Sequence, residues 1–195
     1  MKKRNLWIAL AVVAVVVVWG VSVYNSLVGK NETVVSSWSQ VENQYQRRYD
    51  LVPNLVNTVK GYAEHEKGLL EGVVEARSKA TSMTLDVESM TAEQLSEYLK
   101  VQNELGSAIK TSIVAIGEAY PDLKASNNFV ELQAQLEGCE NRIAVARKDF
   151  NEAVRGYNLK VKRFPSNLVA GLFGFDQKAY FESNEAAADA PVVAF

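Results

Sequence analysis

An uncharged apolar run near the amino terminus constrains this chain more than any other feature of its sequence. Residues 6–24, LWIALAVVAVVVVWGVSVY, are 19 residues without a charged side chain. As an α-helix rising 1.5 Å per residue, the run would extend about 28 Å, close to the ~30 Å hydrocarbon thickness of a bilayer. Trp7 lies near one end, and Trp19 and Tyr24 near the other, where interfacial aromatic residues are expected. We therefore predict a transmembrane helix over residues 6–24, with the lipid bilayer as its partner.

A cleavable signal peptide is the alternative interpretation of the same run. The apolar core of a signal peptide is normally about 7–15 residues long and precedes a small-x-small cleavage site. The segment GVSVYNS, residues 20–26, provides only a weak site of that kind. An uncleaved anchor is therefore favoured.

Basic residues on one flank predict the orientation of this helix. The amino-terminal flank, residues 1–5, holds Lys2, Lys3 and Arg4, whereas the first basic residue after the run is Lys30. Because positively charged flanks stay on the cytoplasmic side, we expect a cytoplasmic amino terminus and a soluble domain on the outer side.

The charge balance and the rare residue types exclude several classes of function. Without the three flanking charges, 18 of the 21 basic residues remain against 23 acidic ones, which leaves a net charge of −5. This balance favours neither nucleic-acid binding nor a polybasic clamp on anionic lipid. The single cysteine, Cys139, excludes an internal disulfide, and the single histidine, His65, excludes sites that need two imidazoles from one chain.

Beyond the run, apolar residues recur with the period of an α-helix, and no stretch alternates as a half-buried strand does. A first long helix is predicted to continue from the span to a polar break at residues 81–90. Thr91 and Gln94 form a capping box that starts a second helix, which ends near Tyr120 because Pro121 disfavours helical geometry before it. The apolar stripe of this helix is Leu95, Leu99, Leu105, Ile109, Ile113 and Ile116.

A third long helix is predicted to run from a cap at Asn128, with Glu131 three residues on, to Pro165. Three long amphipathic helices with short connections predict an all-α fold. In that fold a single amino-terminal transmembrane helix continues into an antiparallel bundle of three long helices, followed by a short helical and aromatic carboxyl-terminal segment. The stripe of the third helix is Phe129, Leu132, Leu136, Cys139, Ile143, Phe150, Val154, Tyr157, Val161 and Phe164.

The unequal helix lengths divide the exported part into predicted regions. Counted back from the turn near Thr81, the second helix covers the first only to about Tyr49. Residues 25–48 are therefore predicted to form a helical stalk about 35 Å long, residues 49–164 the bundle, and residues 165–195 a carboxyl-terminal segment and tail. The stalk needs a cover, either a second subunit's stalk in a coiled coil or the aromatic carboxyl-terminal segment folded back. Its apolar stripe is Val34, Trp38, Val41 and Tyr45.

Pro53 lies inside the first predicted helix, where it removes a hydrogen-bond donor. It fits either as a modest kink or as an early-turn residue of a helix capped by Asp50. The kink is favoured, because the apolar stripe continues nearly in phase across the proline.

The side of the first helix opposite its stripe is polar and rich in glycine. Each glycine inside a helix costs about 1 kcal/mol relative to alanine. The face is either solvated, with its glycines tolerated, or it allows another helix to approach closely. This candidate partner-facing surface consists of Asn54, Asn57, Gly61, His65, Gly68 and Gly72.

Arg48 falls on the apolar side of the same helix, where it is expected to form a structural ion pair. By helix register its candidate partners are Glu118, Glu131 and Glu137. A buried arginine without a carboxylate would be strongly destabilising.

No residue pattern indicates catalysis, a cofactor or a metal site. A di-iron bundle uses Glu-x-x-His motifs, but Tyr62 stands three residues before His65 and no second histidine exists. Cys139 lies within an apolar stripe without a histidine nearby in sequence, so it is expected in the core rather than as a nucleophile. We therefore expect a protein that is not an enzyme.

The chain resembles the LemA family of bacterial membrane proteins from about Tyr24 to Phe195. The segments that carry the resemblance are YNSLV (24–28), WSQVENQYQRRYDLVPNLVNTVKGYAEHE (38–66), EARSKA (75–80), YPDLKASNNFVELQAQLEGCENRIAVARKDFNEAVRGYN (120–158), FPSNLVAGLFGF (164–175) and the terminal PVVAF. The resemblance implies one membrane helix, a helical-bundle domain and a place in the bacterial cytoplasmic (inner) membrane, and it transfers no catalytic residue. The family's short amino terminus is often placed outside, whereas the flanking charges here favour a periplasmic soluble domain.

These observations favour a membrane-anchored scaffold or adaptor that presents helical faces, and the PVVAF terminus, to an envelope protein. A homo-oligomeric membrane-shaping protein that associates through its stalk is the first alternative. A hydrolase or metal-dependent enzyme within the bundle is the second.

Overall fold

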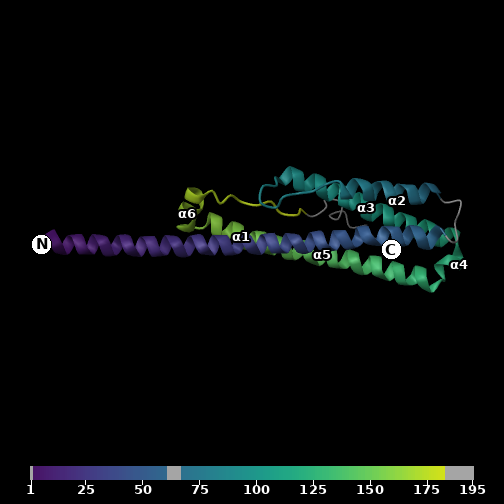
Figure 1. Cartoon of the computed structure of the whole chain (residues 1–195), viewed down its shortest axis with the longest axis horizontal. Helices are drawn as coiled ribbons and strands as arrows, with labels where there is room; N and C mark the ends of the chain where they lie inside the picture. Colours follow the sequence, from purple (N-terminus) through teal and green to yellow (C-terminus); the bar gives the residue numbers. More distant parts are fainter. Residues whose placement is uncertain (1, 61–66, 183–195) are drawn as a thin grey trace, which may run out of the picture.

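The computed structural model describes residues 2–60 and 67–182, and within those ranges it contains helices and no strand (Figure 1). The predicted all-α fold is confirmed. The helices are α1 (Lys2–Lys60), α2 (Lys67–Thr81), α3 (Ala92–Ala119), α4 (Pro121–Lys124), α5 (Asn127–Lys162) and α6 (Ser166–Phe173).

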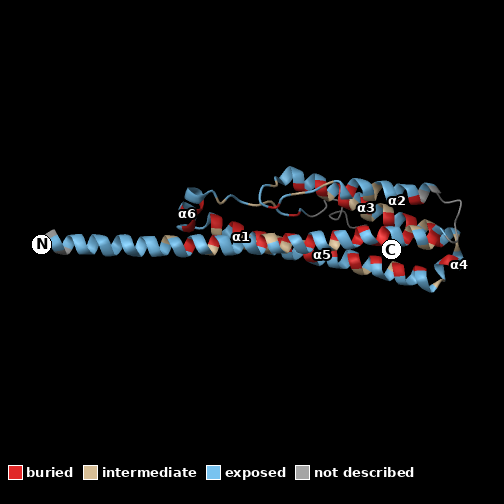
Figure 2. Cartoon of the chain, viewed as in Figure 1, coloured by how far each residue is buried: buried red, intermediate tan, exposed pale blue. Residues whose placement is uncertain are grey.

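Helix α1 joins the apolar run and the bundle without interruption. It contains 59 residues and is therefore about 88 Å long. Its apolar run is exposed from Leu6 to Trp19, and buried residues begin at Val23, near the end of the run (Figure 2). Within the described residues, α1 is the one helix long and apolar enough to cross a membrane.

The first helix ends earlier than the sequence pattern predicts. We expected it to continue to the break at residues 81–90, but α1 ends at Lys60 and residues 67–81 form the separate helix α2. The carboxyl-terminal part of α2 lies beside Tyr49, whose hydroxyl donates to the carbonyl of Ala80, so α2 runs back along α1. Three glycines within 12 residues, Gly61, Gly68 and Gly72, lower the helix propensity of this part of the sequence.

The long helices pack as two pairs. α5 follows α1 along the longest seam of the molecule, and α2 packs on α3. The core cluster joins residues from all four helices, with Leu55 of α1, Val73 of α2, Leu105 of α3 and Phe150 of α5 among its fully buried members (Figure 2).

The predicted stalk is covered by the same chain. Trp38 packs edge-on to Phe150 of α5 at 5.5 Å between ring centroids, and it stacks on Phe181 at 5.9 Å. Of the two covers expected, the chain therefore uses its own carboxyl-terminal segment. α5 adds a second cover, which the comparison of the first helix with the second alone did not foresee.

Two asparagines of α5 hold the carboxyl-terminal segment in place. Asn158 donates to the carbonyl of Lys178 at 2.8 Å and accepts from its amide at 2.9 Å. Asn151 makes the same pair of bonds with Phe181, at 2.9 and 2.8 Å. The segment after α6 therefore runs antiparallel to α5 and carries Phe181 to Trp38.

The local signals at the ends of the helices are partly confirmed. Thr91 and Gln94 form the predicted capping box of α3, and Tyr120 caps its carboxyl end. The cap predicted for the third helix at Asn128 is wrong: α5 begins at Asn127, and the hydroxyl of Ser126 accepts from the amide of Phe129 at 3.4 Å. Serine one residue before the helix can reach that amide, whereas Asn128 is already inside the first turn.

Pro53 lies within α1, and the helix continues across it. Pro53 therefore does not restart a helix capped by Asp50. A proline cannot donate to the carbonyl four residues before it, which here is Tyr49. The guanidinium Nε of Arg77, from α2, donates to that carbonyl at 2.9 Å. The proline thus frees the acceptor that ties α2 to α1.

Candidate functional site

Arg48 is the buried charge at the centre of the bundle, with 1% of its surface exposed. One guanidinium nitrogen donates to Glu140 at 3.1 Å, and the other donates to the backbone carbonyl of Gln102 at 3.0 Å and to its side-chain oxygen. The guanidinium also lies over the Tyr45 ring, 5.1 Å from its centroid. Arg48 therefore connects α1 with both α3 and α5.

The predicted ion pair exists, but its carboxylate is Glu140. The three candidate partners of Arg48 lie elsewhere: Glu118 is exposed, Glu131 accepts from Gln135, and Glu137 accepts from Gln133. The carboxylate of Glu140 is half-exposed, so water screens its charge while the arginine is buried.

A second arginine closes one end of the same cluster. Arg147 donates from Nε to the Tyr45 hydroxyl at 2.8 Å and from Nη2 to Asn103 of α3 at 3.3 Å. Burial raises the pKa of the Tyr45 phenol against the effect of the nearby Arg147 charge, so the phenol stays neutral at physiological pH. Arg147 also lies 5.7 Å from the centroid of the Phe181 ring.

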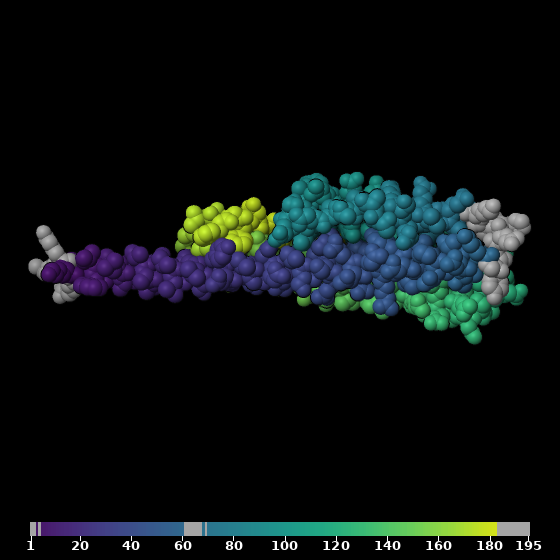
Figure 3. Space-filling model, in the orientation of Figure 1, coloured from purple at the N-terminus to yellow at the C-terminus, as the bar shows by residue number. Residues whose placement is uncertain are grey.

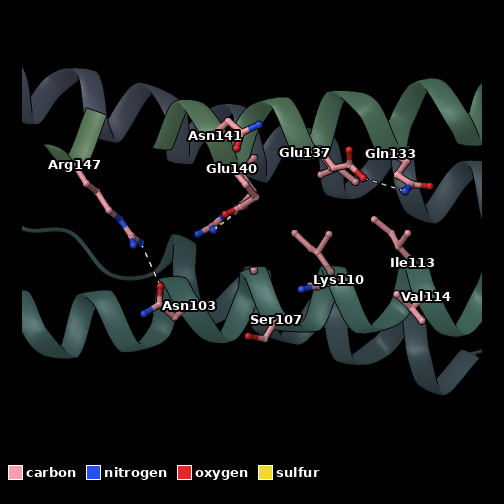
Figure 4. A pocket seen from close by; sticks show the side chains of 14 residues that line it. Asn103, Ser107, Lys110, Ile113, Val114, Gln133, Glu137, Glu140, Asn141 and Arg147 are labelled. Carbon is pink, nitrogen blue, oxygen red and sulfur yellow. Dashed lines mark hydrogen bonds and ion pairs between the residues drawn. The ribbon is translucent and has the colours of Figure 1, made fainter. Parts of the chain in front are cut away.

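α3 and α5 leave a groove of about 790 Å³ between them, and this cluster lines one end of it (Figure 4). Apolar side chains of both helices line it, among them Ile109 and Ile113 of α3 and Leu136 of α5. The polar side chains that line it include Asn103, Ser107, Lys110, Gln133, Glu137, Asn141 and Arg147. Figure 4 shows α3 and α5 facing each other, with these side chains along the space between them. We call this feature the α3–α5 groove.

Comparison of the sequence with protein-family models gives one match that covers most of the chain. The family model described as the LemA family matches residues 37–195. The chain belongs to the LemA family.

Relatives of this LemA-family chain include two magnetosome proteins. It is 26% identical over 187 residues to magnetosome protein MamQ 2 of Paramagnetospirillum magneticum, which covers 87% of this chain and 68% of the relative. It is 25% identical, with the same coverage, to magnetosome protein MamQ of Magnetospirillum gryphiswaldense. Protein LemA of Metamycoplasma hominis is 22% identical over 161 residues, or 83% of this chain and 69% of the relative. With the apolar part of α1, these relatives indicate a membrane-associated helical protein.

The candidate partner-facing surface is divided between two helices in this LemA-family chain. Asn54 and Asn57 are exposed on α1, and Gly68 and Gly72 are exposed on α2. A methyl group added at either glycine would meet no atom within 4 Å. No helix of the described chain therefore uses these glycines for a close approach, while Gly61 and His65 lie outside the described residues.

The described residues do not bring potential metal ligands together into one site. No group of three or more His, Cys, Asp or Glu side chains there is arranged to hold a metal ion. Cys139 is buried, as predicted, with Sγ 3.5 Å from the carbonyl of Gln44. Burial raises the pKa of its thiol, which disfavours the thiolate that a nucleophile needs.

The sequence analysis missed the groove and the buried Gln102, which contacts Arg48. Gln102 is fully buried, donates to the Tyr49 hydroxyl and accepts from Arg48. A glutamine next to the Leu99 and Leu105 stripe was the available signal. The groove depends on the angle between two helices, for which the sequence pattern carries no direct signal.

Proposed function

We propose that this LemA-family protein is a membrane-anchored scaffold or adaptor of the bacterial cell envelope, without catalytic activity, which binds a segment of another envelope protein in the α3–α5 groove. The observation that carries the proposal is the open groove between α3 and α5, with its apolar and charged lining.

The lining of the groove suits an amphipathic protein segment. Ile109, Ile113 and Leu136 provide the apolar contact, while Lys110 and Glu137 provide charges of both signs. An amphipathic helix laid into such a groove buries its apolar face and leaves its polar face to the rim. Binding in such a groove requires no catalytic residue.

The position of the groove suits a tether. Arg48, which lines the groove, lies 24 residues beyond Tyr24 on the uninterrupted helix α1, or about 36 Å at 1.5 Å per residue. The rigid helix would hold the docked segment at a set height above the bilayer. The partner-facing surface at Asn54, Asn57, Gly61, His65, Gly68 and Gly72, and the PVVAF terminus, are further proposed contacts on the same scaffold.

The proposed location is the bacterial cytoplasmic (inner) membrane, with the soluble bundle on the periplasmic side. The basic flank at residues 1–5 supports this orientation. A reporter fused after Phe195 that is active only in the periplasm would support it, and one active only in the cytoplasm would reverse it.

Two valines of nearly equal exposure test the docking proposal. Val114 lines the groove and is 51% exposed, whereas Val130 is 54% exposed on α5 and does not line it. Tagged full-length protein is purified from native membranes as wild type, Val114→Asp and Val130→Asp. We expect Val114→Asp to lose the co-purifying protein that wild type and Val130→Asp retain. Equal retention by both variants would contradict docking in the groove.

The same purification separates the alternatives. If the retained species is a second copy of this chain, the homo-oligomeric membrane-shaping function replaces the adaptor. If His65→Ala or Cys139→Ser abolishes the cellular phenotype while the protein stays folded and keeps its partner, the function is chemical.

A further inference from the structure

The helix α6 and Phe164, two residues before it, expose a cluster of large apolar side chains to solvent. Phe164 is 76% exposed, Leu168 62%, Leu172 79% and Phe173 57%. We expected Phe164 to end the buried stripe of the third helix, and that prediction is wrong, because α5 ends at Lys162 and the chain turns away. We call these four residues the α6 apolar surface.

The opposite side of α6 is buried, so α6 carries apolar residues on both of its sides. Ser166, Val169 and Ala170 are buried where α6 packs on α1 and α5. Leu168 and Leu172 are four residues apart and therefore share the outward face. Large apolar side chains on the exposed face of a short helix are expected where a second apolar phase covers them.

The position of α6 identifies that phase. Tyr24, the last residue of the predicted span, packs edge-on to Phe173 at 4.9 Å and to Phe175 at 5.6 Å between ring centroids. Gly174 makes this turn possible, with a φ of 72° in the left-handed region. α6 thus adjoins the place where α1 would leave the bilayer.

The figures show the same relation at the scale of the molecule. In Figure 1, α6 lies across the direction of α1, at the end of the bundle that faces the amino terminus. In Figure 3 it covers α1 next to the part of that helix which nothing else covers. A short helix that lies across a membrane span, next to the end of that span, is placed to lie along the bilayer surface.

Basic residues accompany the apolar surface. Lys162 and Arg163, at the end of α5, are exposed immediately before Phe164, and Lys30 is exposed six residues after Tyr24 on α1. In-plane amphipathic helices combine buried apolar side chains with cations that reach lipid phosphates.

We propose that α6 is a second membrane contact: it lies in the bilayer interface with Leu168 and Leu172 among the acyl chains, and it fixes how the bundle stands on its tether. The surface is continuous with the apolar face of the span, and this continuity favours lipid over protein as its occupant. The inference rests on residues 6–24 crossing the bilayer, which is part of the proposed function.

The test uses nitroxide spin labels on the full-length protein in phosphatidylcholine–phosphatidylglycerol nanodiscs. Cys139→Ser provides the background, and single cysteines are placed by Leu172→Cys, Val15→Cys and Glu152→Cys. Val15 reports the span, and Glu152 is an exposed residue of α5. Accessibility to oxygen relative to a water-soluble nickel complex measures the depth of each label.

We expect the label at residue 172 to lie below the headgroups, between the deep label at 15 and the aqueous label at 152. If residue 15 reads lipid while residue 172 reads water, the α6 contact is wrong and the anchor stands. If residue 15 also reads water, both the anchor and the α6 contact fail. Dipolar broadening between labels at residue 172 in discs that hold two copies would assign the surface to a second chain and overturn the proposal.

A second variant guards against misfolding at Leu172. Leu168→Cys lies one helical turn earlier on the same face and should give a similar depth, while Asn54→Cys, exposed on α1 far from α6, should give the aqueous value. Aqueous values at both 168 and 172 would contradict the proposal.

Discussion

The two sides of α5 show how one helix can serve both stability and binding. Toward α1, its stripe meets apolar and aromatic residues and closes a long seam, where Phe150 contacts Trp38 and Phe181. Toward α3, a hydrogen bond joins Arg147 to Asn103, and the groove lies between the two helices. The seam is filled by the chain itself, whereas the groove retains an apolar lining without an occupant from the described chain.

The difference follows from the side chains at the two contacts. Trp38, Phe150 and Phe181 gain by excluding water, so the helices that carry them close on each other. Arg48 and Arg147 bridge the bundle with long polar side chains that need hydrogen-bond partners at fixed distances. Such bridges set the spacing of α3 from α5 at one end of the groove.

Phe150→Ala should have the largest effect, because it opens a cavity in the closed seam. We expect a loss of about 3–5 kcal/mol in the free energy of unfolding, measured by denaturant titration of the protein in detergent. Val114→Ala, in the groove, should change it by less than about 0.5 kcal/mol. Equal losses at the two positions would remove the distinction between seam and groove.

Arg48→Met tests the bridge between the two sides. The change leaves the buried side-chain oxygen of Gln102 without its donor and removes one donor from the Gln102 carbonyl, so we expect a loss of about 3 kcal/mol in the free energy of unfolding. Glu140→Gln should cost about 1 kcal/mol or less, since its carboxylate is half-exposed. A larger loss for Glu140→Gln than for Arg48→Met would show that the ion pair, rather than the arginine's buried hydrogen bonds, holds the bundle.

Arg77→Met tests how Pro53 and α2 are coupled. Removing the donor to the Tyr49 carbonyl should cost about 1 kcal/mol of unfolding free energy. Pro53→Ala supplies a helical amide to the same carbonyl, so Arg77→Met should cost less in that background. If the double-mutant cycle shows no coupling between the two positions, Pro53 does not contribute to the packing of α2 on α1.

The reactivity of the native Cys139 thiol tests the seam without any change in stability, and it has the smallest expected effect. Its thiol lies in the seam, and burial raises its pKa, so alkylation by iodoacetamide at pH 8 should be much slower than at Val130→Cys on the exposed side of α5. Rates should converge in denaturant. Comparable rates in the folded protein would mean that the seam opens readily.

The sequence predicted those parts of the fold that depend on local signals. The stripes of α3 and α5 and the capping box at Thr91 are local, and the structure confirms them except at Phe164. The reversal between Lys60 and Lys67 was missed, because the apolar stripe of α2 repeats that of α1 nearly in phase. The glycines at 61, 68 and 72 were the signal that a single helix was unfavourable there.

The candidate site was predicted less completely, because it depends on how distant helices align. Arg48 was recognised as an ion-pair residue, but Glu140 replaced Glu137, one helical turn away. That register is set across 92 residues, including the one-turn helix α4 between α3 and α5. The groove needs both the register and the angle between helices, which periodicity does not determine.

A photocrosslinking scan along α5 in living cells tests the central claim most directly. Crosslinking amino acids are placed at Gln133, Glu137 and Asn141, which line the groove, and at Val130 and Lys148, which lie outside it. The adaptor account predicts an adduct with a different envelope protein from the groove positions and little or none from the others. Adducts of equal yield from both sets, or none from the groove positions, would contradict it.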